Sequence, residues 1–372
     1  MGRVKGRKRR VPAFFGVTFR LVLIIAALCL FLSYISSYID PARFSVPLFF
    51  GLYFIPILII NIVLFLIAAV SGSRSAWIPI IALLPALLFA ERFFRFGGSS
   101  DEGSYGSRFT IQTYNVGKFQ LAKNRTSPAK ALEEITRQVN DSDPDILCLQ
   151  EVYLDSIEMT RTIFPGYRYR TYHLFRHGNG KRSGNMILSK YQITQGKVLT
   201  FRHSTNLSLF ADIILEGDTV RIYDNHLESY AISPTSLVKR ISEKRKNSED
   251  VREEIINVHT KVRNTVIRRS KQVAAILSNI QKSPYPAIIC GDFNDTPMSY
   301  TYHKLSYGSK DTFKESGKGF SATYSMLWPL LRIDYIFIPK SFTGISHNTI
   351  RNAYSDHYPV IAEFGKEAMA EK

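Results

Sequence analysis

Cysteine is scarce in this sequence of 372 residues, and its three cysteines all lie within apolar runs. Cys29 falls in a long apolar segment, whereas Cys148 and Cys290 fall in short apolar runs typical of strands. Isolated buried cysteines usually behave as small hydrophobic residues. A disulfide between Cys148 and Cys290 is conceivable but not required, so cysteine content does not identify the compartment.

Acidic residues are scarce in the first 100 positions, which contain 2 Asp and Glu against 11 Lys and Arg. This leaves 37 basic and 29 acidic side chains, a net charge of +8, for the rest of a chain whose formal charge is +17. A strongly basic C-terminal part is therefore excluded. Its moderate positive charge suits an anionic substrate or an anionic membrane surface without choosing between them.

Charged side chains are nearly absent from three apolar segments near the N-terminus. Residues 17–39 and 46–70 are each long enough to cross a bilayer core of about 30 Å, and Arg20 lies close enough to one end to snorkel. The segment 76–90 is shorter and contains two prolines, so it either spans with help from the following phenylalanines or lies partly in the interface. No small-residue cleavage site follows the first segment, which argues against a cleaved signal peptide.

Lys and Arg are distributed unevenly around these segments. Six lie in residues 1–10, whereas the two connecting loops contain only Arg43 and Arg74. Because positive charge tends to stay on the cytoplasmic side, we expect the N-terminal tail to be cytoplasmic. Two spans would leave the C-terminal part in the cytoplasm, and three would place it outside. We expect three, and hence a multi-pass protein of the inner (plasma) membrane with an extracytoplasmic C-terminal domain.

Composition divides the chain into three parts. Residues 1–96 form a membrane region with two to three transmembrane helices, residues 97–107 a small, polar, flexible linker, and residues 108–367 one large domain. In this domain, Pro128 is predicted to begin a helix with Ser127 as its N-cap. Alternating strands and helices, without an evident internal repeat, indicate the α/β class. Strands are predicted at 108–114, 146–151, 184–189, 209–215, 220–226, 286–291, 333–338 and 357–364, and a basic helical stretch at about 233–282.

Polar side chains occur within or at the end of several of these apolar runs. Burying an unpaired charge is expensive, so strand ends of this kind predict one polar site at which they converge. Their oxygen and imidazole groups suit a hard divalent cation and phosphate chemistry. The positions are Asn115, Glu151, His226, Asp292, Asn294, Asp334, Asp356 and His357.

The motifs around these positions, taken in order, resemble those of the endonuclease/exonuclease/phosphatase superfamily. They read IQTYNVGKF, DILCLQEVY, RIYDNHLES, AIICGDFNDTP, LRIDYIFIP and SDHYPVIAEF. The resemblance covers roughly residues 107–365 and implies a metal-dependent hydrolase of phosphate esters. It also implies a four-layer α/β/β/α sandwich of two mainly antiparallel sheets, preceded here by transmembrane helices.

The resemblance implies a metal site. Glu151 is the expected principal ligand, with Asp356 beside it and Asn115 binding directly or through a water molecule. One or two carboxylates plus waters suit Mg²⁺, which keeps part of its hydration shell, and Mn²⁺ is a possible substitute.

The remaining positions receive catalytic roles from the same resemblance. Asp292 would orient or deprotonate the attacking water, and Asn294 would bind a non-bridging phosphate oxygen. Asp334 would fix the tautomer of His357, whose other nitrogen would donate to the charge that develops on phosphorus. His226 would lie near the phosphate or the leaving group. Asp224 stands where related enzymes often have Asn, and its role stays open.

The substrate is less clearly indicated than the chemistry. Arg176, Lys181 and Arg182 lie in a basic loop, and Lys and Arg recur between 239 and 271; both stretches either contact an anionic substrate or are solvated surface. We expect a nuclease-like endonuclease first. The alternatives are a phospholipid or sphingomyelin phosphodiesterase, an inositol-phosphate-type phosphatase, and a non-catalytic membrane scaffold. The expected partners are the phosphate-ester substrate, nucleic acid or phospholipid, and the lipid bilayer, with no protein partner.

Overall fold

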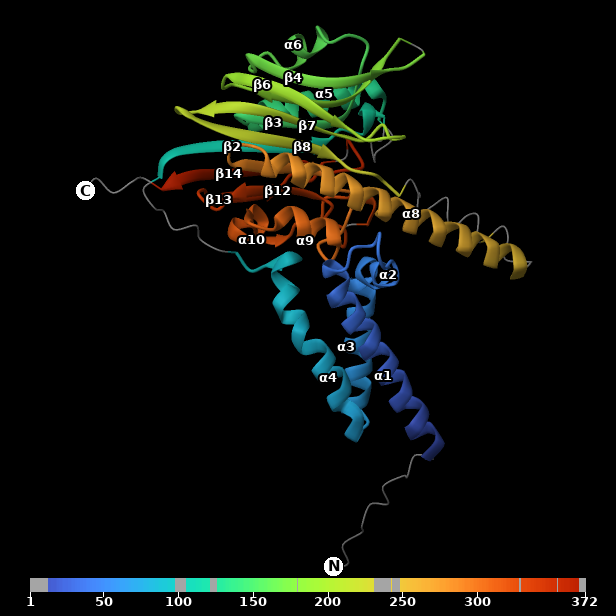
Figure 1. Cartoon of the computed structure of the whole chain (residues 1–372). Helices are drawn as coiled ribbons and strands as arrows, with labels where there is room; N and C mark the ends of the chain where they lie inside the picture. Colours follow the sequence, from blue (N-terminus) through green and yellow to red (C-terminus); the bar gives the residue numbers. More distant parts are fainter. Residues whose placement is uncertain are drawn as a thin grey trace, which may run out of the picture.

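A layered α/β domain stands on a bundle of apolar helices, and the N-terminal end of the bundle lies farthest from the domain (Figure 1). The computed structural model describes residues 13–97, 105–120, 126–178, 180–230, 242, 248–327, 329–352 and 354–367.

Two six-stranded sheets form the centre of the domain. The first contains β2 (Tyr105–Asn115), β3 (Ile146–Leu154), β4 (Tyr169–Arg176), β5 (Arg182–Ser189), β13 (Thr343–Thr349) and β14 (Val360–Glu367). The second contains β6 (Ile193–Thr200), β7 (Leu207–Leu215), β8 (Asp218–His226), β9 (Ala287–Asp292), β10 (Ser309–Asp311) and β12 (Asp334–Pro339). Their orders are β13-β14-β2-β3-β5-β4 and β10-β12-β9-β8-β7-β6. Each is antiparallel except for one central pair, β2 with β3 and β8 with β9.

Helices cover the outer face of each sheet. Helix α5 (Pro128–Ser142) and the short α6 (Met159–Ile163) lie on the first sheet. The long α8 (Ser248–Gln281) and the short α9 (Tyr300–Ser306) lie on the second (Figure 1), and the short α10 (Thr312–Ser316) packs against the edge strand β13 of the first sheet and against β10 and β12 of the second. The expected four-layer sandwich of two mainly antiparallel sheets is therefore confirmed.

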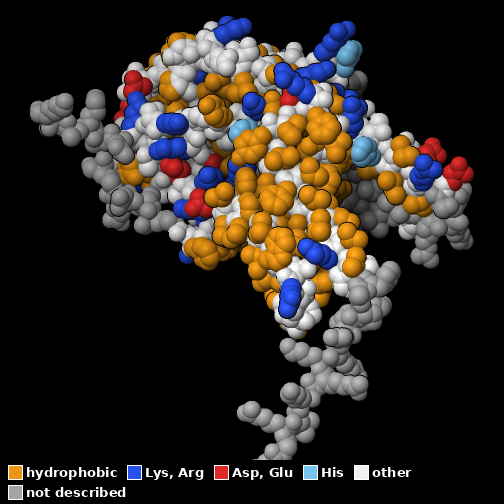
Figure 2. Space-filling view, turned by 60° about the horizontal axis from the view of Figure 1, so that its bottom comes forward, with side chains coloured by type: hydrophobic (Ala, Val, Ile, Leu, Met, Phe, Trp, Pro, Cys, Tyr) orange, Lys and Arg blue, Asp and Glu red, His pale blue; other side chains and the backbone are white. Residues whose placement is uncertain are grey.

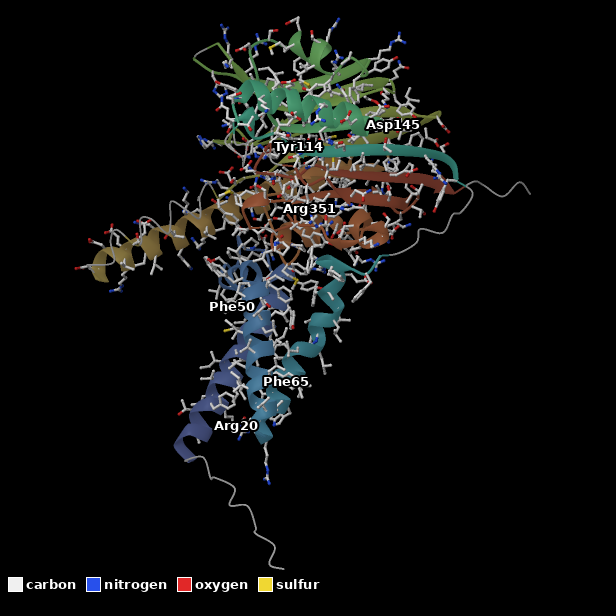
Figure 3. All side chains as sticks on the ribbon, turned by 180° about the vertical axis from the view of Figure 1, so that it is seen from behind. Arg20, Phe50, Phe65, Tyr114, Asp145 and Arg351 are labelled. Atoms are coloured by element: carbon white, nitrogen blue, oxygen red, sulfur yellow. The ribbon has the colours of Figure 1, made fainter. Side chains whose placement is uncertain are left out.

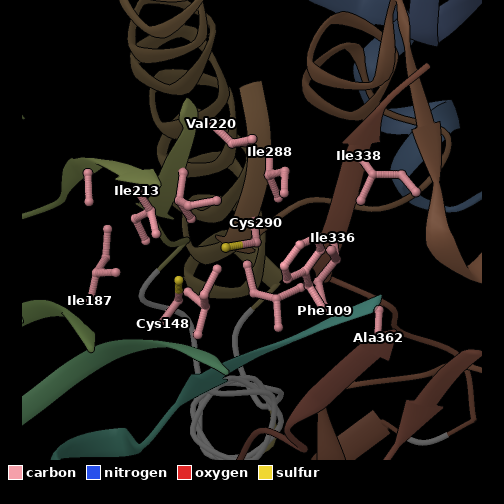
Figure 4. Close-up of a cluster of buried hydrophobic side chains, with 14 of the residues drawn as sticks. Phe109, Cys148, Ile187, Ile213, Val220, Ile288, Cys290, Ile336, Ile338 and Ala362 are labelled. Carbon is pink, nitrogen blue, oxygen red and sulfur yellow. The ribbon is translucent and has the colours of Figure 1, made fainter. Parts of the chain in front are cut away.

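The main core lies between the sheets and consists of aliphatic side chains from both (Figure 4). Ile213 and Ile288 of the second sheet lie in the same cluster as Ile187 of the first. Cys148 and Cys290 also belong to it, as free thiols, and burial raises the pKa of both. They act here as small hydrophobic residues.

The predicted elements are found with shifts of a few residues at their ends. Ser127 caps α5 by accepting a hydrogen bond from the backbone N–H of Lys130 at 3.4 Å. Strands β4, β6 and β13 were not predicted, because they are half-exposed edge strands without an apolar run. The basic helical stretch begins later than expected, at Ser248; residues 231–241 and 243–247 lie outside the described residues.

The apolar region forms three legs that run toward the domain, away from it and back (Figure 1). They are α1 (Ala13–Ile35), α3 (Phe54–Val70), and α4 (Trp77–Leu83) with its continuation η3 (Leu84–Arg92). Gly16–Tyr38 and Arg74–Arg92 are long and apolar enough to cross a membrane. Arg20 lies toward the far end of the bundle, as snorkelling requires (Figure 3).

The second apolar segment is not one continuous helix, which corrects the sequence-based expectation. Helix α2 (Val46–Leu52) and α3 meet at an angle of 72°. Pro56 explains the break, because a proline lacks the N–H that would bond to the carbonyl four residues earlier, here that of Leu52. Helix α2 therefore lies under the domain, and only α3 continues along the bundle (Figure 1).

The loop after β9 is docked onto the top of the bundle. Met298 is 0% exposed and belongs to the apolar cluster inside the bundle. Its carbonyl accepts a hydrogen bond from Ser36 Oγ at 2.9 Å, and the carbonyl of Pro297 accepts one from Arg92 Nη1 at 2.9 Å. A Cβ at Gly51 would lie 2.9 Å from the same Met298 oxygen, so the approach requires glycine. Domain and bundle are thus joined by packing as well as by the chain.

The close contact between β8 and β9 predicts a strong effect of one methyl group. Gly291 has a φ of +121°, and a Cβ there would lie 2.0 Å from the carbonyl oxygen of Asn225. We expect Gly291→Ala to cost more than about 3 kcal/mol, because backbone strain and overlap add. Gly217→Ala is the matched control, since its φ is +92° but nothing lies within 4 Å. Thermal unfolding followed by circular dichroism should show a much larger fall in Tm for Gly291→Ala; equal falls would contradict the steric argument.

Candidate functional site

Polar side chains from both sheets meet at one end of the domain. In the two parallel pairs, Asn115 lies beside Gln150, and His226 lies beside Asp292. Parallel strands bring their carboxyl ends to the same edge of a sheet, so each pair delivers two neighbouring side chains. Tyr114 marks this end of the first sheet and Asp145 the opposite end (Figure 3). The strand ends predicted to converge lie together here.

Asp292 is the centre of the site. It is 1% exposed, and its carboxylate accepts hydrogen bonds from Asn115 Nδ2 at 2.9 Å and from the backbone N–H of Asn294 at 2.8 Å. Burial raises the pKa of Asp292, opposed by His357 and reinforced by Asp334. A carboxyl group with a raised pKa is a stronger base than an exposed one.

Asn294 faces Asp292 because the chain turns sharply after β9. Its φ of 52° lies in the left-handed region. This turn brings its Nδ2 to 3.1 Å from Asp292 Oδ2 and 3.0 Å from the carbonyl oxygen of Leu227. Asn294 therefore holds Asp292 in place.

Asp334 and His357 form a buried pair. Asp334 Oδ2 lies 2.9 Å from His357 Nδ1, and His357 Nε2 lies 3.7 Å from Asp292 Oδ2. Burial lowers the pKa of His357, but the carboxylates of Asp334 and Asp292 outweigh it and hold the pKa well above its usual value. The imidazole is therefore positioned as a cation whose Nε2–H points into the site.

Glu151 leaves the regular ladder of β3. The register between β3 and β5 shifts between Leu149 and Val152, and Glu151 has a φ of 52°. Bulges of this kind re-aim a side chain beside active sites. Its partly exposed carboxylate has Oε1 3.5 Å from His226 Nε2, and His226 Nε2 in turn lies 3.9 Å from Asp292 Oδ2. The bulge thus turns Glu151 toward the other sheet.

Asp356 is repelled by two other carboxylates of the site. Burial raises the pKa of Asp356; His357 opposes this effect, and Glu151 and Asp292 add to it by repulsion. Repulsion among carboxylates is the electrostatic condition that a bound divalent cation relieves. The donor set therefore fits a hard metal ion.

Asn115 lies between two of these carboxylates and acts as a donor. Its Nδ2 lies 2.9 Å from Asp292 Oδ2 and 3.4 Å from Glu151 Oε1, and its Oδ1 accepts from the backbone N–H of Gly117 at 3.0 Å. In this orientation the amide holds the two carboxylates and turns its oxygen away from them.

Asp224 lies between the sheets, beneath the mouth of the site. It is fully buried, and Gln150 Nε2 donates to its Oδ1 at 2.5 Å. Burial raises the pKa of Asp224 well above its usual value, against hydrogen bonds from Gln150 and Asn185 that lower it. The residue whose role the sequence left open therefore joins the two sheets and does not face the site opening.

The predicted substrate-binding cations lie in the β4–β5 hairpin, where Arg176 pairs with Arg182 in register. This hairpin lies at the same end of the first sheet as Glu151. Lys181 Nζ lies 3.4 Å from Asp155 Oδ1 and 5.1 Å from the centre of the Tyr153 ring. The hairpin is therefore beside the site, with one of its cations committed to a neighbour.

Three residues beside the site were missed by sequence reasoning. Ser355 Oγ donates to the carbonyl of Asn115 at 2.8 Å and accepts from the backbone N–H of His357 at 3.2 Å. Thr323 Oγ1 accepts from the backbone N–H of Asp334 at 3.1 Å. The Tyr324 ring lies edge-on to the His357 ring at 5.5 Å. Ser355 could have been found beside Asp356 in the SDH motif; the other two come from a loop with no signal in its spacing.

Asp295 both caps a turn after β9 and anchors the loop to other elements. Its Oδ1 accepts from the backbone N–H of Thr296 at 3.1 Å, and its carboxylate lies 2.8 Å from the fully buried Arg269 of α8. Tyr335 Oη donates to its carbonyl at 2.8 Å. The loop that follows Asp292 and contains Asn294 is thus anchored on α8 and β12 as well as on the bundle.

Comparison with known families agrees with this geometry. The model of the endonuclease/exonuclease/phosphatase family matches residues 113–357, which is more than half of the chain, so the protein belongs to this family of phosphate-ester hydrolases. A second family model, described as a domain of unknown function, matches residues 14–93. A comparison with curated proteins finds no significant match.

Solved structures show the same fold at low sequence identity. A family member from Bacteroides vulgatus is 15% identical with a TM-score of 0.51, and the match covers 70% of this chain and 100% of that one. The human nocturnin catalytic domain with a bound sulfate anion is 16% identical, with a TM-score of 0.50 and coverages of 70% and 94%. A member from Beutenbergia cavernae is 16% identical, with a TM-score of 0.50 and coverages of 70% and 72%.

The docking of the loop after β9 predicts that the bundle affects turnover. We expect Arg92→Ala to lower kcat on a soluble chromogenic diester by about 10- to 100-fold, because loss of the bond to Pro297 lets the loop shift that follows Asp292 and holds it through Asn294. KM should change little. Arg95→Ala is the matched control, since Arg95 bonds to Glu91 at 2.7 Å and not to the loop. Equal kcat values for both variants would show that the contact is passive.

The Asp334–His357 pair predicts non-additive kinetics. Asp334→Asn and His357→Gln should each lower kcat by about 100-fold or more. The double variant should be no slower than the slower single variant, because each change disables the same unit. His347→Gln provides the control, since this buried histidine bonds to Thr312 away from the site. Additive losses would mean that the two residues act independently.

Proposed function

We propose that the protein is a membrane-anchored, Mg²⁺-dependent phosphodiesterase in which water attacks phosphorus in line with the leaving group. The supporting observation is the environment of Asp292: a buried carboxylate with a raised pKa, fixed by two asparagines and faced by two histidines. Polar and titratable groups gathered around one buried acid with a raised pKa are typical of catalytic sites.

Mg²⁺ fits the donor set because it prefers oxygen ligands and keeps several waters. We assign it to Glu151 and Asp356, whose carboxylates repel one another and stay in part open to solvent. Ligand atoms of Asp292, Asp334 and His357 also lie within 4.8 Å of one another. The 2.9 Å hydrogen bond to Asp334 already occupies His357 Nδ1, so this nitrogen is not available to a metal ion. We therefore place the ion beside Glu151.

A bound Mg²⁺ would supply positive charge to a phosphate oxygen, and Mn²⁺ shares its preference for carboxylate and water ligands. The chain's own groups supply the remaining steps. Asp292 orients the attacking water and accepts its proton. Protonated His357 donates through Nε2 to the negative charge that develops on phosphorus, while Asp334 holds its Nδ1–H.

His226 completes this arrangement. It approaches Glu151 and Asp292 from the second sheet, at the place where a phosphate oxygen or the leaving group would lie. Asn294 would bind a phosphate oxygen by exchanging one of its two amide hydrogen bonds. A non-catalytic scaffold needs none of these groups in mutual reach, so the arrangement supports catalysis over the scaffold alternative.

A nuclease would require free cations along a groove. The β4–β5 hairpin supports this alternative, but many cations of α8 are engaged within the protein. Arg269 pairs with Asp295 at 2.8 Å, Arg268 with Glu228 at 3.1 Å, and Arg263 bonds to Ser45 at 2.9 Å. The basic appearance of the sequence between 248 and 271 therefore overstates the charge available to a nucleic-acid backbone.

We further propose three membrane spans, with the catalytic domain on the extracytoplasmic side of the membrane. The legs of the bundle run toward the domain, away and back, so the start of α1 and the domain lie at opposite ends (Figure 1). Together with a basic tail retained in the cytoplasm, this arrangement supports an extracytoplasmic catalytic domain.

The catalytic proposal predicts metal-dependent turnover by the full-length protein in detergent. Bis(p-nitrophenyl) phosphate should be hydrolysed with Mg²⁺, not with excess chelator, and again when Mg²⁺ is restored. Asp292→Asn should lower kcat at least about 100-fold. Asp218→Asn is the control, because this exposed acid lies at the start of β8, away from the site. Metal-independent turnover, or near-normal turnover by Asp292→Asn, would refute the assignment.

A further inference from the structure

An exposed apolar segment lies between the site and the bundle. It consists of four side chains, which we call the apolar lip: Phe320, Met326, Leu327 and Leu330, exposed by 45%, 44%, 37% and 45%. Single exposed hydrophobic residues are common on proteins, but several close together in one loop mark an interaction surface. The loop closes on itself, because the backbone N–H groups of Thr323 and Tyr324 both donate to the carbonyl of Leu331.

The base of this loop is part of the site's wall. Tyr324 pairs with His357 in an isolated β-bridge, and its ring lies 5.5 Å from the His357 ring. The backbone N–H of Ser325 donates to the carbonyl of Asp356 at 2.8 Å. Met326 and Leu327 follow directly in the chain after Tyr324 and Ser325, which contact His357 and Asp356. A molecule that contacts Met326 and Leu327 therefore lies close to the catalytic histidine and the assigned metal ligand.

The other end of the loop is attached to the exit of the third apolar leg. Strand β11 (Gly319–Phe320) pairs with β1 (Phe94–Arg95), which follows η3 directly. The rings of Phe94 and Phe320 lie 4.9 Å apart, and Phe96 is 93% exposed.

Apolar surface is thus continuous from the bundle to the lip. Leu87 and Leu88 are exposed on η3, immediately before β1. Hydrophobic side chains cover the bundle and continue onto the adjoining underside of the domain (Figure 2). A bilayer that surrounds the helices would reach this end of the lip first.

We propose that the apolar lip enters the interface of the bilayer in which the bundle is embedded, and that the site takes its phosphodiester from a lipid of that bilayer. Transfer of exposed Phe, Leu and Met side chains from water to the boundary between head groups and acyl chains lowers the free energy. The lip then holds the lipid's head-group phosphate at the level of His357, while the acyl chains stay in the membrane.

The reaction is a hydrolysis. A P–O bond forms from water, the P–O bond to the leaving alcohol breaks, and the proton of the water ends on that alcohol, so no redox partner is needed. This inference rests on the proposed phosphodiesterase function, and it names the bilayer as the occupant of the lip. A protein partner or a second copy of the chain would leave lipid turnover independent of the lip.

The test uses the full-length protein in proteoliposomes of phosphatidylcholine, phosphatidylglycerol and sphingomyelin, with Mg²⁺. The variant Met326→Ser/Leu327→Ser/Leu330→Ser should lower lipid hydrolysis, measured as released head groups, by at least tenfold. Its kcat on bis(p-nitrophenyl) phosphate should stay within twofold of the wild type. Replacing Met326 and Leu327 by Trp should retain lipid hydrolysis, because tryptophan partitions into the interface.

Tyr172→Ser is the matched control, since Tyr172 is 41% exposed on β4, the edge strand of the first sheet, remote from the bundle (Figure 1). It should leave both activities unchanged. Equal lipid turnover by the lip variant and the wild type would overturn the inference, as would plasmid nicking by a wild type that leaves all three lipids intact. In either case turnover of the soluble diester would preserve the phosphodiesterase assignment. Loss of soluble turnover in the wild type would instead refute the proposed function itself.

Discussion

The site depends on keeping one carboxylate, that of Asp292, buried where two sheets meet. Removing a charge from water is costly unless hydrogen bonds and opposite charges replace the water. Here Asn115 crosses from the first sheet to donate to it, Asn294 turns into the left-handed region to reach it, and His357 faces it from the loop before β14. Each of these groups comes from a different segment, so the pKa of Asp292 is a property of the assembled domain.

The same loop is fixed from outside the sheets. Arg269 of α8 pairs with Asp295, Arg92 bonds to Pro297, and Ser36 bonds to Met298, so three distant parts of the chain hold the residues that follow Asp292. Two of these contacts come from the apolar bundle. The bundle is therefore better described as a support for the loop after β9 than as a tether.

The sequence predicted those features that are local or carried by a motif. The strand ends around Glu151 and Asp292 were found because a polar residue after a buried run needs a partner. The edge strand β6 was missed because half-exposed strands lack an apolar pattern, and the bend before Pro56 was missed because hydropathy does not register a lost hydrogen bond. The contact between Met298 and the bundle joins residues 262 positions apart, Ser36 and Met298, and no local pattern reports such a distance.

The net charge of the domain and the position of its site point to different substrates, and the position of the site carries more weight here. The C-terminal part of the chain has a net charge of only +8, and several cations of α8 are already paired internally. Long-range attraction of a polyanion needs unpaired charge and weakens with salt. A site beside a bilayer, as proposed, would select lipids without either requirement, because the lipids would be confined to the surface that the bundle and the apolar lip share. If the apolar helices lie in a bilayer as proposed, their docking onto the domain would bring the lipid substrate to the site, and the surface charge of the domain would contribute less to substrate selection.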